Sequence, residues 1–137
     1  MILLDAGPLV AITNRRDRFH GWAHDYLSRL HGPLICCGAV LSEAAFVLRH
    51  DALPLSRIRD QIDRGNLVAA RETPALWQRA LALMENYANV PMSFADACLV
   101  ALAEETSDAR IFTLDRDFLI YRQFNGRRLQ LIAPFEE

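Results

Sequence analysis

Five short apolar runs, most of them separated by longer segments with helical periodicity, constrain the fold more than any other feature of this chain. The first run is Ile2 to Leu4, and it ends at Asp5. Because Gly7 and Pro8, which often interrupt regular structure, come soon after it, we predict a buried strand that leads into a loop. The other four expected strands are 34–37, 67–70, 111–114 and 129–132. Strands that alternate with helices favour parallel pairing with helices on both faces of the sheet. The sequence therefore predicts an α/β fold with a mainly parallel central sheet.

The expected helices have apolar residues three or four positions apart and recognisable boundaries. Thr73 and Ser93 are expected N-caps, Pro74 suits the first turn of a helix, and Pro91 separates two helices. The five expected helices are 19–30, 39–49, 55–64, 74–87 and 94–105. Since no repeat, linker or low-complexity segment interrupts this pattern, we expect a single domain over residues 1–137.

Composition limits the classes of function. No apolar run approaches the roughly 20 residues that span a bilayer, and the first residues do not resemble a signal peptide, so we expect a cytoplasmic protein without a membrane partner. Cys36, Cys37 and Cys98 are expected to be buried thiols, and the pair His20 and His24 has no second pair that would complete a zinc site. The net charge of −2 gives no basic excess, so any contact with nucleic acid must be local.

Four acidic residues follow strands or lie in the first turns of helices. Asp5 ends the first apolar run, Glu43 lies early in the helix 39–49, Asp96 begins the helix 94–105, and Asp115 ends the fourth run. Because ligands of open parallel sheets bind outside the carboxyl ends of the strands, we expect these side chains to converge at one edge. Taken singly, most of them also fit an ordinary turn or helix-capping role.

Helical periodicity argues against a purely structural role for two of these acids. Glu43 and Asp96 share a face with apolar residues: Val40, Ala44 and Val47 for Glu43, and Met92, Leu99, Val100 and Ala103 for Asp96. An ionised carboxylate in such a stripe costs several kcal/mol unless it is paired or binds a cation, and neither stripe offers an arginine. Oxygen ligands suit Mg²⁺ or Mn²⁺, whose usual chemistry is at phosphates, so we favour a nuclease.

The segments MILLDAGPLVA, LSEAAFVL, PMSFADACLVALAE and IFTLDRDF resemble the four acidic motifs of PIN domains, particularly of VapC-type toxins. The resemblance extends from Ile2 to Pro134. It implies a three-layer α/β/α sandwich and an Mg²⁺-dependent ribonuclease, with Mn²⁺ as the other candidate ion. It also implies that the chain is the toxin of a type II toxin–antitoxin pair, inhibited by a cognate antitoxin protein and typically a homodimer.

The resemblance also implies roles for individual residues. Asp5, Glu43, Asp96 and Asp115 match the catalytic acids that hold the metal, and Thr113 resembles the hydroxyl residue that supports the site through water. The last motif, TLDRDF, offers both Asp115 and Asp117, and we prefer Asp115 because it lies nearer the end of the strand. The motifs leave open whether one or two ions bind and which RNA is cut.

Two groups of residues have both a functional and a structural interpretation. Arg15, Arg16 and Arg18 follow the loop after the first strand, where they would contact RNA phosphates or form a solvated loop. The apolar residues Leu76, Ala80 and Leu83 would support self-association or core packing equally well.

Other classes of function fit the sequence less well. A haloacid-dehalogenase-like phosphatase should carry a second aspartate where Gly7 stands and a motif lysine, and the chain has no lysine. No strand is followed by the glycine pattern of a dinucleotide site. A non-enzymatic alternative is a PIN-like RNA-binding or interaction module with a vestigial site, which the presence of all four acids disfavours.

Overall fold

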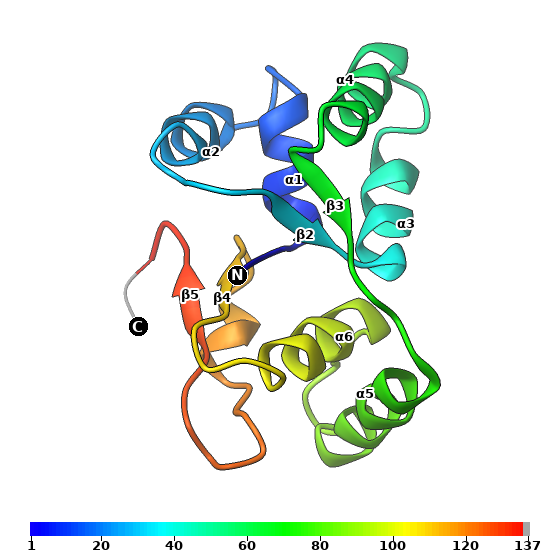
Figure 1. Cartoon of the computed structure of the whole chain (residues 1–137), viewed down its shortest axis with the longest axis vertical. Coiled ribbons are helices and arrows are strands. Elements are labelled where there is room, and N and C mark those ends of the chain that lie inside the picture. The colour runs from blue at the N-terminus through cyan, green and yellow to red at the C-terminus, as the bar shows by residue number, and fades with distance from the viewer. Residues whose placement is uncertain (136–137) are drawn as a thin grey trace.

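The computed structural model describes residues 1–135 as a five-stranded parallel sheet with helices on both faces (Figure 1). The strands are β1 (Ile2–Leu4), β2 (Leu34–Cys36), β3 (Leu67–Ala69), β4 (Arg110–Phe112) and β5 (Gln130–Ile132). Their order is β3-β2-β1-β4-β5, and all four pairings are parallel. The predicted parallel α/β fold is confirmed, and each strand overlaps one of the five apolar runs. The three middle strands β2, β1 and β4 are mostly buried, as apolar runs require, whereas two of the three residues of the edge strand β3 are exposed.

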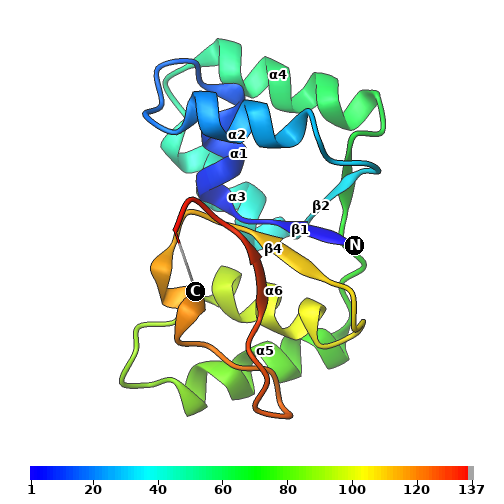
Figure 2. The ribbon, with the colours of Figure 1, turned by 90° about the vertical axis from the view of Figure 1, so that its left-hand side faces the viewer.

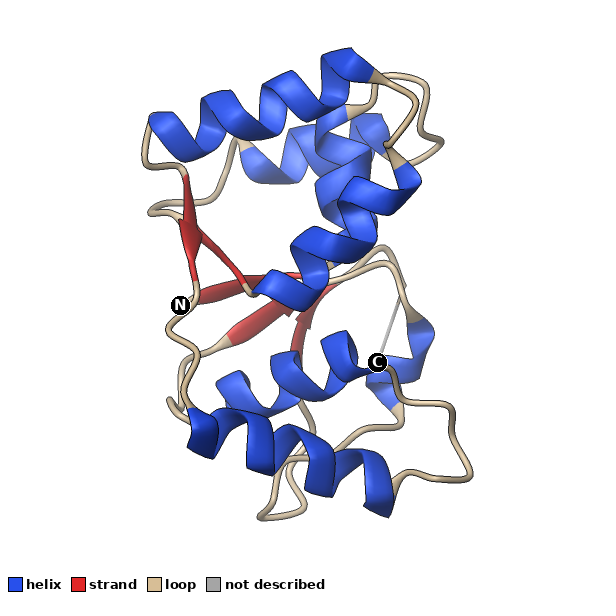
Figure 3. Ribbon diagram, turned by 90° about the vertical axis from the view of Figure 1, so that its right-hand side faces the viewer, coloured by secondary structure: helices blue, strands red, loops and turns tan. Residues whose placement is uncertain are grey.

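The helices form two layers that enclose the sheet. They are α1 (Ala6–Thr13), α2 (His20–Leu27), α3 (Gly38–Val47), α4 (Ala52–Asp63), α5 (Pro74–Asn86) and α6 (Phe94–Ala103), with a 3₁₀ helix, η1 (Arg116–Leu119), after β4. Figures 2 and 3 show α1 to α4 on one side of the sheet and α5 and α6 on the other. This arrangement is the predicted three-layer α/β/α sandwich.

The sequence prediction of a loop after β1 is wrong, because α1 begins at Ala6 directly after Asp5. Gly7 and Pro8 lie in the first turn of α1. Proline is tolerated there because a first-turn N–H has no partner within the helix. The Asp5 carboxylate accepts a hydrogen bond from the Ala6 N–H and so caps the helix, which places Asp5 at the junction of strand and helix.

The lower helical layer is built on α6, which packs against β1 and β4 and is covered on its outer side by α5. Ser93 and Thr73 cap α6 and α5 as predicted. The residues proposed for self-association, Leu76, Ala80 and Leu83, are all buried on α5 in the hydrophobic core. The self-association interpretation of these three residues is therefore wrong, since core packing accounts for their burial.

Two other sequence expectations concern cysteine chemistry and membranes. Cys36, Cys37 and Cys98 are free and buried, as predicted. Within residues 1–135, no helix has both the length and the apolar character needed to cross a bilayer.

Candidate active site

The candidate site lies at the carboxyl ends of the two central strands. The chain order reverses between β1 and β4, and such a switch point is where ligands of open parallel sheets bind. Asp5 follows β1, and its N–H donates to the Phe112 carbonyl at 2.9 Å, which ties it to the end of β4. Thr113 and Asp115 follow β4 directly. Two helices supply the other predicted acids, Glu43 from α3 and Asp96 from α6.

Asp5 is held rigidly and is 6% exposed. One carboxylate oxygen accepts from the Ala6 N–H at 2.8 Å, and the other accepts from the Thr113 hydroxyl at 2.7 Å. The Thr113 hydroxyl also accepts from the Asp115 N–H at 3.0 Å, so this buried side chain connects two of the acids. Burial raises the pKa of Asp5 to about 6 although both hydrogen bonds lower it, and the charges of Asp115 and Glu43 raise it further.

Asp96 lies in the first turn of α6 and is also buried, as its place on an apolar stripe predicted. Its Oδ2 accepts from the hydroxyl of the fully buried Tyr121 at 3.0 Å. Burial raises the pKa of Asp96 to about 6, and the charges of Asp5 and Asp115 add to this rise, while the bond from Tyr121 opposes it. A carboxylate in this position is destabilised in its charged form.

Glu43 differs from the expectation that placed it within an apolar stripe. Its side chain is exposed, because α3 turns the face of Glu43 and Val47 outward while Val40 and Ala44 are buried. The pKa of Glu43 is nevertheless raised, first by partial burial and then by the charge of Asp96 and that of Asp115. The desolvation argument from the sequence therefore applies mainly to Asp96.

Asp115 has both of the roles that the sequence left open for it. Its Oδ1 accepts from the Asp117 N–H at 2.8 Å and so caps η1. Its charge also raises the pKa of Asp5, Glu43 and Asp96. The four acids therefore lie close enough for their charges to act on one another at this edge of the sheet.

The donor set fits a hard divalent cation in its chemistry. All four candidate ligands are carboxylates, and none of them forms an ion pair with a cationic group of residues 1–135. As placed, no three acidic, histidine or cysteine side chains in this part of the chain are grouped tightly enough to hold an ion. Mutual repulsion favours such separation, so binding would require the carboxylates to draw together.

Sequence reasoning missed Tyr121 as a partner of this site. It lies 25 residues from Asp96 along the chain. The only signal in the sequence is an aromatic residue after the last acidic motif, which does not indicate where its hydroxyl points. Thr113, by contrast, was singled out through the family resemblance as a residue that supports the site through water, and in the structure its hydroxyl donates directly to Asp5.

Comparisons with known proteins agree with this architecture. The family model described as PIN domain matches residues 2–122. No curated protein matches the sequence. Among solved structures, Mycobacterium tuberculosis VapC20, described as a sarcin-ricin loop cleaving toxin, is similar with a TM-score of 0.75 and 18% identity, covering 85% of this chain and 92% of that one.

Two further structures are similar over whole chains. A toxin–antitoxin complex from Klebsiella pneumoniae is similar with a TM-score of 0.68 and 16% identity. FitAcB from Neisseria gonorrhoeae is similar with a TM-score of 0.60 and 14% identity. Each match covers 100% of this chain and 100% of the other. At these identities the likenesses establish a common fold.

Proposed function

The chain belongs to the PIN domain family, and from this premise we propose that residues 1–137 act as one divalent-metal-dependent ribonuclease domain. The observation that carries the proposal is the burial of Asp5 and Asp96 beside each other's charge, while no cationic side chain among residues 1–135 forms an ion pair with either. Retaining two destabilised carboxylates costs stability, and a bound cation would offset that cost.

In this proposal Asp5, Glu43, Asp96 and Asp115 hold Mg²⁺, with Mn²⁺ as an alternative ion. A divalent cation at this position would supply a Lewis acid for hydrolysis of an RNA phosphodiester. Thr113 fixes the orientation of Asp5 through its 2.7 Å hydrogen bond. Tyr121 fixes Asp96 in the same way, through its 3.0 Å hydrogen bond to Oδ2.

The proposed biological role is that of a toxin in a toxin–antitoxin pair. It is supported by similarity in fold to VapC20 and to the toxin–antitoxin complex from Klebsiella pneumoniae. A cognate antitoxin would then be the protein partner, and the cytoplasm would be the site of action. We also propose a homodimer, to which the exposed Trp77 and Leu81 of α5 would contribute, in place of the buried residues of that helix.

The experiment that tests the activity is cleavage of a panel of RNAs by the purified chain, with Mg²⁺ or with EDTA, alongside Asp5→Asn and Asp96→Asn. We expect cleavage only with the cation and only by the wild-type chain, with 5′-phosphate and 3′-hydroxyl ends on the products. Cyclic phosphate ends would instead indicate attack by the ribose 2′-hydroxyl. Cleavage that persists in EDTA, or in both variants, would refute the proposal.

A further inference from the structure

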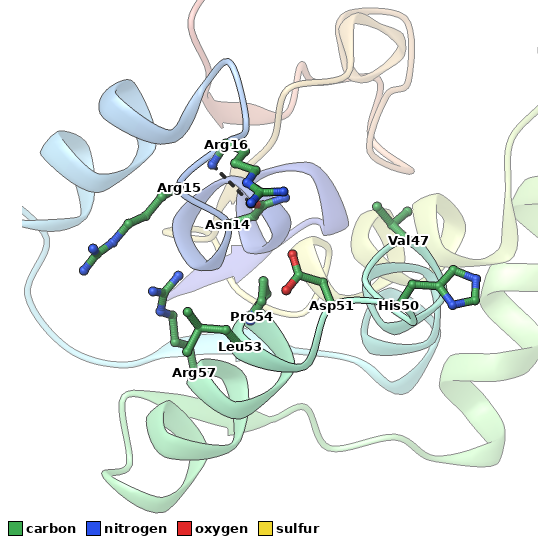
Figure 4. Close-up of a pocket in the computed structure, with 9 residues that line it drawn as sticks. All are labelled: Asn14, Arg15, Arg16, Val47, His50, Asp51, Leu53, Pro54 and Arg57. Carbon is green, nitrogen blue, oxygen red and sulfur yellow. Dashed lines mark hydrogen bonds between the residues drawn. The ribbon is translucent and has the colours of Figure 1, made fainter.

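A pocket of about 470 Å³ lies apart from the four acids, where the ends of α1 and α3 meet the start of α4 (Figure 4). Its charged wall consists of Arg15 and Arg16 from the segment after α1, Asp51 at the N-cap position of α4, and Arg57 from α4. Two further polar residues, Asn14 and His50, also line it. Val47, at the end of α3, contributes an exposed apolar edge. The pocket is therefore lined by three arginines and one carboxylate, a local excess of positive charge on a chain whose net charge is −2.

The arginines of this pocket are not used in ion pairs. Among residues 1–135, none of Arg15, Arg16 and Arg57 lies within ion-pair distance of a carboxylate, Asp51 included. Arg57 is positioned by a hydrogen bond from its Nη1 to the Thr13 carbonyl at 2.7 Å. Figure 4 shows it pointing from α4 toward the segment that carries the other two arginines. The pocket therefore carries one anchored guanidinium group and two that form no ion pair, and Figure 4 shows the Arg15 and Arg16 side chains extending in different directions from the segment after α1. Guanidinium groups that are free of carboxylates are suited to bind an anion.

The pocket is connected to the acids along two helices. Asp5 caps the start of α1, and the eight residues of α1 span about 12 Å before the pocket begins at Asn14. On α3, Val47 lies one helical turn after Glu43 and on the same exposed face. A stacked strand that rises roughly 3.4 Å per nucleotide would cover this distance in about three or four nucleotides.

We propose that this arginine pocket binds a backbone phosphodiester of the RNA strand, a few nucleotides from the bond that is cut. The inference rests on the proposed ribonuclease function and adds a substrate subsite to it. The guanidinium groups of Arg15, Arg16 and Arg57 donate hydrogen bonds to the phosphate oxygens, which positions the strand without selecting its bases. Asp51 moderates the positive charge of the pocket, so its carboxylate weakens the binding of the same phosphate.

The test measures binding separately from cleavage. A fluorescein-labelled single-stranded RNA with a 5′-hydroxyl end, which excludes a terminal phosphate as the ligand, is titrated with Asp5→Asn protein in EDTA. Into this protein we introduce Arg15→Gln, Arg57→Gln or Asp51→Asn, with Arg59→Gln as the matched control. Arg59 is an exposed arginine two residues from Arg57 on α4 and lies outside the pocket. Fluorescence anisotropy gives the affinity between about 50 and 200 mM salt.

The proposal predicts changes of opposite sign. Complete loss of the phosphate contact would remove about 0.7 from the slope of log affinity against log salt, which corresponds to about fourfold weaker binding at 0.15 M salt. Because the arginines share one phosphate, each single arginine variant should lose part of that slope and bind RNA up to about fourfold more weakly. Asp51→Asn should bind RNA more tightly, and its helix cap is unaffected because the Asp51 side chain makes no capping hydrogen bond. Arg59→Gln should bind like the parent.

Three results would overturn the subsite. The first is an unchanged slope in both Arg15→Gln and Arg57→Gln, and Arg15 is the cleaner of the two because, within residues 1–135, it takes part in no ion pair. The second is an equal loss in Arg59→Gln, which would indicate diffuse surface charge. The third is that the arginine variants bind RNA as the parent does but no longer bind an acidic peptide, which would assign the pocket to a protein partner. Failure of the ribonuclease proposal would be seen separately, as absence of cleavage by the wild-type chain.

Discussion

Replacing Asp96 with asparagine should stabilise the metal-free protein, against the usual effect of changing a buried polar residue. The pKa of Asp96 is about 6 in the folded protein and 3.8 in its ordinary state, so the folded state holds the proton more tightly. The contribution of protonated Asp96 to the free energy of unfolding is therefore fully present below pH 3.8, and it is lost as the pH rises through 6 and the carboxylate becomes charged. A rise of about two pKa units corresponds to about 3 kcal/mol at neutral pH.

Asparagine cannot ionise, so the variant avoids the loss of stability that the wild type undergoes when Asp96 becomes charged, and it retains most local contacts. Its amide oxygen can accept the hydrogen bond from Tyr121, and its NH₂ group can donate toward the neighbouring carboxylates. We expect the variant to gain about 2 to 3 kcal/mol in the free energy of unfolding at pH 7.5, and a melting temperature higher by roughly 6–12 °C. At pH 4 the gain should nearly vanish, because wild-type Asp96 is then largely protonated.

The assay is urea and thermal unfolding of both proteins in EDTA from pH 4 to pH 8, with Asp60→Asn as control. Asp60 is an exposed acid paired with Arg64 on α4, and its loss should cost at most about 0.5 kcal/mol at neutral pH. If Asp96→Asn instead melts lower than wild type at pH 7.5, Asp96 serves as a structural capping residue, and the repulsion argument for the site fails.

Three further predictions concern the surroundings of the acids. Thr113→Val removes the hydrogen bonds through which the Thr113 hydroxyl joins Asp5 and Asp115, so it should destabilise the protein by about 2 to 3 kcal/mol in urea unfolding. It should also slow any RNA cleavage, and an unaffected cleavage rate would show that Thr113 does not position Asp5. Tyr121→Phe leaves Asp96 without its donor and should cost about 1 to 3 kcal/mol, with the larger loss above pH 6, where the carboxylate is charged; a pH-independent loss in unfolding assays would point to packing alone. Mg²⁺ at a hundredfold excess over its dissociation constant should stabilise the wild type by about 2.7 kcal/mol and Asp96→Asn by much less, and equal melting shifts in both would contradict the assignment.

The strands and most helices were predictable because their signals are local. A strand buried on both faces must be a short apolar run, and the caps at Thr73 and Ser93 act within a few residues. The first helix was missed because Gly7 and Pro8 usually end regular structure, and only the capping geometry of Asp5 shows that they begin it.

The sequence indicated which acids belong to the candidate site, but less well how buried each one is and which residues form hydrogen bonds with it. Asp96 is buried because nearly all of α6 is enclosed between the sheet and α5. Periodicity indicated that Asp96 lies on an apolar stripe of this helix, but not that the helix is buried on its other faces as well. Glu43 is exposed because α3 buries the face that carries Val40 and Ala44, and the sequence pattern alone did not show on which side of that face Glu43 would lie. The hydroxyl of Tyr121 reaches Asp96 through the path of the C-terminal segment, which no local pattern specifies.

The central claim, that Asp5, Glu43, Asp96 and Asp115 together hold a divalent cation, is tested most directly by titrating Mn²⁺ into the protein and following free Mn²⁺ by electron paramagnetic resonance. We expect saturable binding to the wild type, and strongly weakened binding in Asp5→Asn, Asp96→Asn and Asp115→Asn. Asp117→Asn should bind as the wild type does, because Asp117 takes part through its backbone N–H, which the variant retains. Wild-type affinity in Asp5→Asn and Asp96→Asn, or no saturable binding by the wild type, would contradict the account.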